Sequence, residues 1–433
     1  MRLTRGLYYG WVMLLALAFT QVTSWGIRYY GFSVFLKPIG SDLHWSRAAM
    51  TGAFSLALAT SGVAGLFVGR WLDRHGPRLL MTIGSCAAAL LLLALSMVRN
   101  IALFYLIWAA IGVAMAAIFY EPAFAAIATW FIRYRSRALT VITFVGGFAS
   151  VIYIPLITWL VRTQGWRAAL VILAVVLAVT TIPLHALVLR RRPQDLGLLP
   201  DGGPPPSSSQ QGTEGAQSLV LSPQPSERSV RAKDAIHSVS FRWLTSAFFL
   251  AFLANVAVTV HLIPYLTDHG FSAGFAATAA GLIGTLALPG RLIFTPLGGR
   301  IPRRYVAAGI FLFQTLGLIV LVTTRSATGV IIFVVLFGIG FGAITPARAA
   351  LVAEMYGPLE YGSISGVLAL FVTGARAIAP VSVGLLYTLF GRYEPVFWML
   401  IALSILAMGA ILCIERGIPP LTVDDRAIAP HST

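Results

Sequence analysis

Twelve long apolar runs set the limits on how this sequence can fold. About 20 apolar residues in an α-helix cross a hydrocarbon core roughly 30 Å thick, and each run meets that length. We place the predicted spans at residues 8–36, 48–69, 77–98, 102–130, 138–161, 167–189, 243–266, 275–297, 305–324, 328–355, 362–390 and 395–415. Only 11% of the 433 residues are charged, against about 25% in soluble domains. We therefore expect an all-α polytopic membrane protein with twelve transmembrane helices.

The spans form two sets of six, separated by a polar segment. This segment contains "PDGGPPPSSSQQGTEGAQ", whose Pro, Gly, Ser and Gln residues bury too little apolar surface to offset the entropy cost of ordering. We predict four parts. They are an N-terminal six-helix half (1–189), a flexible cytoplasmic linker (190–240), a C-terminal six-helix half (241–415) and a cytoplasmic tail (416–433).

Lys and Arg gather on the loops that share a side with the N-terminus, as in residues 70–78, 133–137 and 300–304. Cytoplasmic loops carry such an excess, so we expect both termini and the linker in the cytoplasm and the protein in the inner (plasma) membrane. The same loops account for much of the net charge of +16. Nucleic-acid binding is therefore not expected.

The two halves repeat one another. "GRWLDRHGPR" (69–78) follows the second span and "GGRIPRR" (298–304) follows the eighth, while "EPAFAAIATWF" (121–131) and "TPARAALVAEMY" (345–356) occupy matching places in the fourth and tenth. A duplicated six-helix unit with a pseudo-two-fold axis along the membrane normal places a substrate site near the midplane, between the halves.

The sequence shows no recognisable catalytic motif. We find no metal-ligand cluster, no phosphate-binding glycine-rich loop and no nucleophile–base set. We therefore expect neither an enzyme nor a nucleotide-driven pump, and no cofactor or metal. A membrane-embedded sensor is a remaining alternative.

The loop "GRWLDRHGPR" resembles the Gly-x-x-x-Asp-Arg-x-Gly-Arg-Arg signature of the major facilitator superfamily, with Pro77 in place of one Arg. The matching residues are Gly69, Asp73, Arg74, Gly76 and Arg78. The resemblance implies the major facilitator fold and a gating role for these residues, whose contacts at helix ends would form in one state and release in another. A plain positive-inside loop explains the arginines but not Asp73 and Gly69 in register. The second copy of the loop lacks the Asp.

Four further blocks resemble the monocarboxylate transporters and the oxalate:formate antiporter family. They are "YYGWVM" (8–13), "GFSVFLKPIGSDLHWSRA" (31–48), "WFIRYRSRALTVITFVGGFAS" (130–150) and "HLIPYLTDHGFS" (261–272). The resemblance implies a secondary transporter, working as a monomer in the lipid bilayer, for a small organic anion such as lactate or pyruvate. Proton-coupled uptake is one form of this function, and carboxylate exchange is the other.

Arginines inside the spans carry the substrate-site prediction. An Arg at a helix centre costs about 2.5–3.5 kcal/mol on insertion scales, so it normally faces the bundle interior or a cavity. Arg291 in "LIGTLALPGRLIFTPLGG" and Arg376 in "FVTGARAIAPVSVG" are such residues, and the resemblance implies basic residues at both positions. Because a guanidinium binds a carboxylate bidentately, we predict that both bind substrate.

The charge balance supports this prediction. The spans also hold Arg28 and Arg348, against the acids Glu121 and Glu354, which leaves a positive surplus. Each Arg could instead pair with a protein carboxylate or cap a broken helix. Glu121 is expected to neutralise Arg28 or Arg348, or to accept a proton. A drug or cation exporter would need the opposite sign of charge in its spans.

Tyrosines and the coupling group complete the predicted site. Tyr30, Tyr120 and Tyr153 are candidates for hydroxyl donors and aromatic walls, with ordinary packing as the alternative. Asp268 in "TDHG" is a candidate proton acceptor if desolvation raises its pKa beside Arg291. His261 competes for that role. A solvated loop acid is the alternative for Asp268.

Overall fold

The computed structural model describes residues 8–202, 230–298 and 300–414, and the described chain is helical throughout its apolar runs. The N-terminal half contains α1 (Tyr9–Trp25), the π-helical turn η1 (Gly26–Tyr30), α2 (Gly31–Leu43), α3 (Arg47–His75), α4 (Pro77–Ser96), α5 (Ile101–Ile118), α6 (Tyr120–Trp130), α7 (Arg135–Gly146), α8 (Ala149–Pro183) and η2 (Leu184–Val188). The C-terminal half contains α10 (Val239–Asp268), α11 (Ala273–Leu297), α12 (Arg303–Thr324), α13 (Ala327–Tyr356), α14 (Tyr361–Phe390) and α15 (Glu394–Leu412).

Polar side chains set where several of these helices begin. The Ser46 hydroxyl accepts a hydrogen bond from the Ala49 amide, and the Asn100 side chain accepts one from the Ala102 amide at 2.7 Å. Ser238 and Ser326 start α10 and α13 in the same way. Such caps satisfy amides that have no partner in the first helical turn. Each of these caps therefore marks where a short loop ends and the next helix begins.

The prediction of an all-α polytopic membrane protein is confirmed. Eleven helical stretches among the described residues are long and apolar enough to cross a membrane. One of them, Arg135–Val188, holds two of the predicted spans, since the helix assignment continues across Gly165 even though that residue has a φ of 76°. If this stretch is counted as two helices that meet at Gly165, the number of spans becomes the predicted twelve.

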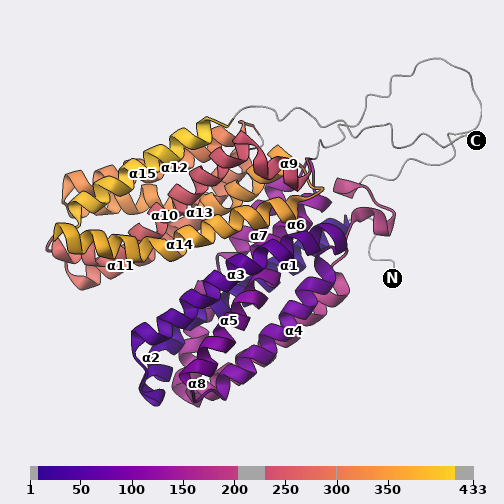
Figure 1. Cartoon of the computed structure of the whole chain (residues 1–433), viewed down its shortest axis with the longest axis horizontal. Coiled ribbons are helices and arrows are strands. Elements are labelled where there is room, and N and C mark those ends of the chain that lie inside the picture. The colour runs from indigo at the N-terminus through magenta and orange to yellow at the C-terminus, as the bar shows by residue number, and fades with distance from the viewer. Residues whose placement is uncertain (1–7, 203–229, 299, 415–433) are drawn as a thin grey trace, which may run out of the picture.

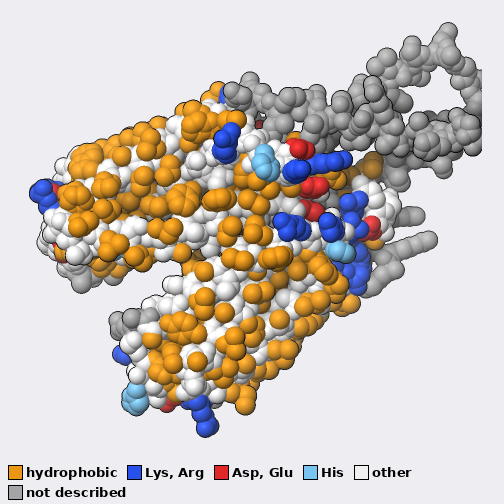
Figure 2. Space-filling view, viewed as in Figure 1, with side chains coloured by type: hydrophobic (Ala, Val, Ile, Leu, Met, Phe, Trp, Pro, Cys, Tyr) orange, Lys and Arg blue, Asp and Glu red, His pale blue; other side chains and the backbone are white. Residues whose placement is uncertain are grey.

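The helices form two lobes that meet at one end and diverge at the other (Figure 1). One lobe is α1–α8 and the other is α10–α15. We call the end with His75, Trp130 and Tyr356 the closed end, and the end with Leu43 and Asp268 the open end. Figure 2 shows a wedge-shaped hollow between the lobes that is widest at the open end.

The outer surface of both lobes is apolar, as contact with lipid requires. Leu90, Leu106 and Leu406 are between 59% and 67% exposed, and hydrophobic side chains cover the visible flanks while Lys and Arg gather at the ends (Figure 2). Inside each lobe, small residues and aromatic rings fill the core. The protein therefore has an apolar band with polar ends.

The two ends of the predicted linker are packed against the helices in the described structure. Residues 193–202 form the short turns η3 (Pro193–Leu196) and η4 (Pro200–Gly202), and the Asp201 carboxylate accepts hydrogen bonds from the Ile132 and Arg133 amides. A short helix, α9 (Ala232–His237), precedes α10, and the Ala232 amide donates to Glu360 at 2.6 Å. These local polar contacts compensate the low apolar content. The middle of the linker and the predicted tail lie outside the described residues.

Candidate functional site

The closed end is joined by a contact between α3 and α14. The Asp73 carboxylate accepts hydrogen bonds from the Gly362 and Ser363 amides, both at 2.8 Å. These amides open α14, so an acid of one half caps a helix of the other. A Cβ at Gly69 would lie 2.1 Å from the Gly362 carbonyl oxygen. The contact therefore needs glycine at 69 as well as the acid at 73.

The other three predicted gating residues do not cross between the halves. Arg78 donates from Nε to the Ala186 carbonyl at 2.7 Å, which ties α4 to η2. Gly76 has a φ of 75°, in the left-handed region that favours glycine, and packs against Arg191. Arg74 is exposed near the end of α3. The structure thus divides the signature into an inter-half contact, Gly69 with Asp73, and a turn that shapes the N-terminal half.

An ion pair forms a second layer between the halves. Arg348 on α13 pairs with Glu121 on α6, and the Ser365 hydroxyl on α14 donates to the other Glu121 oxygen at 2.5 Å. The Arg348 side chain is only 6% exposed. Of the roles considered for Glu121, pairing with Arg348 is the one found in this state. Glu354, the second acid of the spans, pairs with Arg303 at 2.6 Å.

Arg291 lies above this layer, where α11 meets α7. Its Nε donates to the Gly342 carbonyl at 3.2 Å, and its Nη1 donates to the Thr143 carbonyl across the inter-half boundary. A Cβ at Gly147 would lie 2.5 Å from Nη1, so the glycine makes room for the guanidinium. Arg291 has no ion pair with any described acid. Its hydrogen-bond acceptors among the described residues are these two backbone carbonyls.

Arg376 and two tyrosines gather near Arg291. Arg376 lies over the Phe252 ring, with Cζ 4.5 Å from the centroid. Tyr30 is within electrostatic range of both Arg291 and Arg376, and Tyr120 is within range of Arg291. Arg376 is 15 residues into α14, roughly 22 Å from the closed end by helical rise. The four predicted residues come from four different helical elements, and Tyr30 lies near both guanidinia.

Two further predicted residues, Tyr153 and His261, lie elsewhere. Tyr153 is buried in the N-terminal half, where its hydroxyl donates to Thr23 at 3.0 Å, so it has the packing role considered as its alternative. His261 lies within 3.2 Å of both the Tyr393 hydroxyl and the Pro380 carbonyl, between α10, α14 and α15.

The expectation that Asp268 lies beside Arg291 is wrong. Asp268 is exposed at the open end, with the Tyr387 hydroxyl at 3.5 Å. Arg291 is 18 residues along α11, which begins just after Asp268, so helical rise separates them by roughly 27 Å. The sequence proximity of the two segments misled the prediction because α11 runs away from the loop that joins them.

The Major Facilitator Superfamily model matches residues 14–380 and 296–428. The chain belongs to the Major Facilitator Superfamily. It is therefore a multi-pass membrane transporter and not an enzyme.

Relatives of this major facilitator protein agree on the class. The MFS-type transporter YcxA of Bacillus subtilis is 24% identical over 422 residues, which cover 94% of both chains. Monocarboxylate transporter 13 of Bos taurus is 24% identical over 416 residues, 94% of this chain and 90% of the relative. The transporter FucP in its outward conformation has a TM-score of 0.72 at 13% identity and covers 95% of this chain and 100% of its own. This last likeness shows the fold alone.

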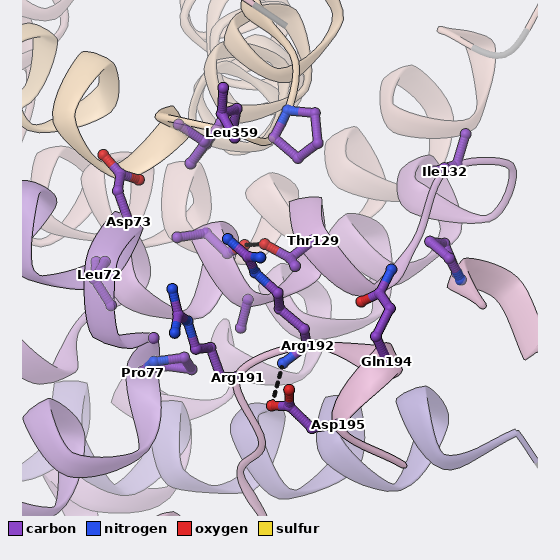
Figure 3. A pocket seen from close by; sticks show the side chains of 16 residues that line it. Leu72, Asp73, Pro77, Thr129, Ile132, Arg191, Arg192, Gln194, Asp195 and Leu359 are labelled. Atoms are coloured by element: carbon purple, nitrogen blue, oxygen red, sulfur yellow. Dashed lines mark hydrogen bonds between the residues drawn. The ribbon is translucent and has the colours of Figure 1, made fainter. Parts of the chain in front are cut away.

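A separate pocket of about 560 Å³ lies at the closed end of this major facilitator protein (Figure 3). Arg191 and Arg192, from the start of the linker, line it together with Asp73 and Thr129 of the N-terminal half. Leu359 of the C-terminal half closes the other side. Because both halves contribute walls, the shape of this pocket depends on their separation.

Sequence reasoning missed the partners that hold the site. Thr143 and Gly342 contribute only carbonyl oxygens, which any residue type supplies, so no sequence signal marks them. Phe252 is one of many apolar residues in α10. Ser365 had a usable signal, because it stands between Gly362 and Gly366, whose spacing matches Gly65 and Gly69 on α3.

Proposed function

We propose that this transporter moves a small organic carboxylate by alternating access, and that the described conformation is open to the outside with its closed end at the cytoplasm. One observation carries the proposal: Tyr30 lies within electrostatic range of both Arg291 and Arg376, and neither guanidinium forms an ion pair with an acid among the described residues. A carboxylate entering from the open end would complete the charge of both guanidinia.

The site favours a small anion with a planar carboxylate. Two guanidinia and the hydroxyls of Tyr30 and Tyr120 supply donors, while Phe252 supplies an apolar wall. The relatives named as monocarboxylate transporters support the same chemical class. A monocarboxylate such as lactate or pyruvate is our first candidate. A dianion moving by exchange is the second, because two fixed positive charges match two negative ones.

A binding test uses purified protein in liposomes and radiolabelled lactate, pyruvate or oxalate. We expect Arg291→Gln and Arg376→Gln each to lower uptake about tenfold to a hundredfold, since a hydrogen bond to a charged group contributes about 1.5–3 kcal/mol. Arg99→Gln, an exposed arginine away from the wedge, is the matched control and should transport at the wild-type rate. Wild-type uptake by both site variants would reject the assignment.

We further propose Glu121 as the proton-coupling group, in preference to Asp268 and His261. Glu121 already links the halves through Arg348 and lies within electrostatic range of Arg376. Protonation would remove the negative charge that holds Arg348, so the closed end could separate. Once released from Glu121, Arg348 would then face the passage through which the anion arrives.

The coupling test compares uptake driven by a pH gradient with counterflow exchange in the same liposomes. We expect Glu121→Gln to abolish the gradient-driven component while retaining exchange, because the amide cannot release a proton. Asp268→Asn, at the open end, should retain both activities and serves as the control. Gradient-driven uptake by Glu121→Gln would exclude the coupling role, and a wild-type protein that shows exchange only would favour the antiporter form.

A further inference from the structure

A buried arginine in the N-terminal half takes no part in the central wedge. Arg28 lies in the π-helical turn η1 and is 1% exposed. Its Nε, Nη1 and Nη2 atoms have no hydrogen-bond partner among the described residues, and no described acid pairs with it. The Arg28 guanidinium lies over the Phe119 ring, whose centroid is 5.1 Å from Cζ.

A second unsatisfied donor lies in the wall of the same small cavity. The cavity has a volume of about 10 Å³, and both Arg28 and Trp108 line it. The Trp108 Nε1 atom is also buried without a hydrogen-bond partner among the described residues. The rest of the wall is apolar, with Phe32, Phe35, Met50 and Leu92 among its members. Two different helices therefore contribute donor groups, and the lining offers them no acceptor side chain.

The geometry of η1 explains why Arg28 turns away from the substrate region. A π-helical turn holds more residues than an α-helical turn and so rotates the chain that follows. Tyr29 and Tyr30, the next two residues, are within electrostatic range of Arg376 at the wedge. Arg28 instead faces the interior of its own six-helix half. Such π-turns are frequent at functional sites.

An uncompensated guanidinium in this setting is expensive. Burying an isolated charge costs far more than burying a neutral polar group, and a cation–π contact offsets only part of that cost. A guanidinium and an indole N–H donate hydrogen bonds and accept none. A ligand that satisfies both groups must therefore be an acceptor, carry negative charge and be small.

We propose that this cavity binds a single monatomic anion of the halide class, with chloride as the physiological species. A volume of about 10 Å³ is near the lower limit for one water-sized occupant, which excludes carboxylates and oxyanions. A water molecule would fit but would leave the charge uncompensated and point its own hydrogens at apolar walls. The halide would act as a structural counter-ion inside the N-terminal half, independently of the transported solute.

The test measures the melting temperature of purified protein in sodium gluconate to which chloride, bromide or sulfate is added. A ligand that binds only the folded state raises the melting temperature in a saturable way. We expect chloride and bromide each to raise it by about 5 °C and sulfate to have no such effect. A crystal grown in bromide should show an anomalous peak between Arg28 and Trp108.

Two variants locate the effect. Arg28→Met removes the cation and should abolish the halide dependence, while Trp108→Phe removes one donor and should shift its midpoint to higher chloride. Trp108→Phe keeps the test decisive if Arg28→Met does not fold. Arg99→Gln is the matched control for a lost arginine, and Arg291→Gln separates this cavity from the substrate site. Both should retain the full dependence.

The proposal is overturned if the wild-type melting temperature is the same in gluconate and in chloride. It is equally overturned if Arg28→Met keeps the halide effect, if Arg291→Gln loses it, or if bromide binds elsewhere only. None of these results bears on carboxylate transport, so the two proposals fail independently.

Discussion

At the scale of single residues, the arginines within the spans differ in what each one touches. Arg348 has a carboxylate partner in the opposite half. Arg291 donates to two backbone carbonyls, which are partial charges and leave it able to bind an anion as well. Arg376 lies on an aromatic face, and Arg28 has neither acid nor carbonyl among its described contacts. Residue type alone does not distinguish these four arginines.

Neutral polar groups in the core are satisfied more simply, and they supply a stability prediction. Asn255 on α10 and Gln314 on α12 form a reciprocal amide pair, with donor–acceptor distances of 3.0 and 3.3 Å, and both are at most 3% exposed. We expect Asn255→Leu or Gln314→Met alone to lower the free energy of unfolding by about 1–3 kcal/mol, because each removes hydrogen bonds from a buried amide. The double variant should recover most of this loss.

Equilibrium unfolding in mixed detergent micelles measures the four proteins of this cycle. The coupling between the two sites is the difference between the double variant and the sum of the single variants. Additive losses would show that the two amides do not stabilise each other.

At the scale of helices, close backbone approach decides where the halves can meet. Gly69 on α3 lies against the Gly362 carbonyl on α14, and Gly65 faces Gly366 one turn farther on. Small residues at this spacing let two membrane helices approach closely. The Asp73 hydrogen bonds to Gly362 and Ser363 are possible only at this separation. At the closed end, the Asp73 hydrogen bonds therefore depend on the close packing of α3 against α14.

We predict that Gly69→Ala weakens the closed end, because its Cβ would lie 2.1 Å from a carbonyl oxygen. Gly65→Ala is the matched control, since its nearest atom would be 4.0 Å away. Spin labels at Lys37→Cys and Arg392→Cys, in a background with Cys86 and Cys413 replaced by Ser, report the width of the open end. Gly69→Ala should shift the distance distribution to shorter values. A distribution unchanged from that of Gly65→Ala would contradict this.

At the scale of the whole molecule, the two lobes leave one side of the proposed substrate site accessible and close the other with three successive layers. The layers are Asp73 against α14, Glu121 with Arg348, and Arg291 against α7. Each layer joins residues of both halves, so opening the closed end must break all of them. Such a bistable arrangement lets small changes at the site bias a large rearrangement.

Orientation is the prediction that belongs to this scale. From the Lys and Arg excess near the closed end we expect that end in the cytoplasm. A green fluorescent protein fused after Thr433 should therefore fluoresce, whereas alkaline phosphatase at the same place should be inactive. Phosphatase inserted after Gly165 should be active, because the nearby Arg167 pairs with Asp42 at the open end. The reverse pattern would place the wedge on the cytoplasmic side.

The sequence by itself determined the helices and their number. A bilayer requires apolar runs of a fixed length, and the extent of each run can be read directly from its residues. It also determined that Arg291 and Arg376 are unusual, because charge inside a span is costly wherever it points. Both inferences depend on local composition alone.

Only the tertiary structure decided which partner each charge has. Glu121 lies 227 positions from Arg348 in the chain, yet they pair across the inter-half boundary. Asp268 lies near Arg291 in sequence but at the other end of α11 in space. The carbonyl of Thr143 and the orphaned donors around Arg28 have no signature in the sequence. Coulombic and hydrogen-bond energies depend on distances in three dimensions, which the order of residues along a chain does not specify.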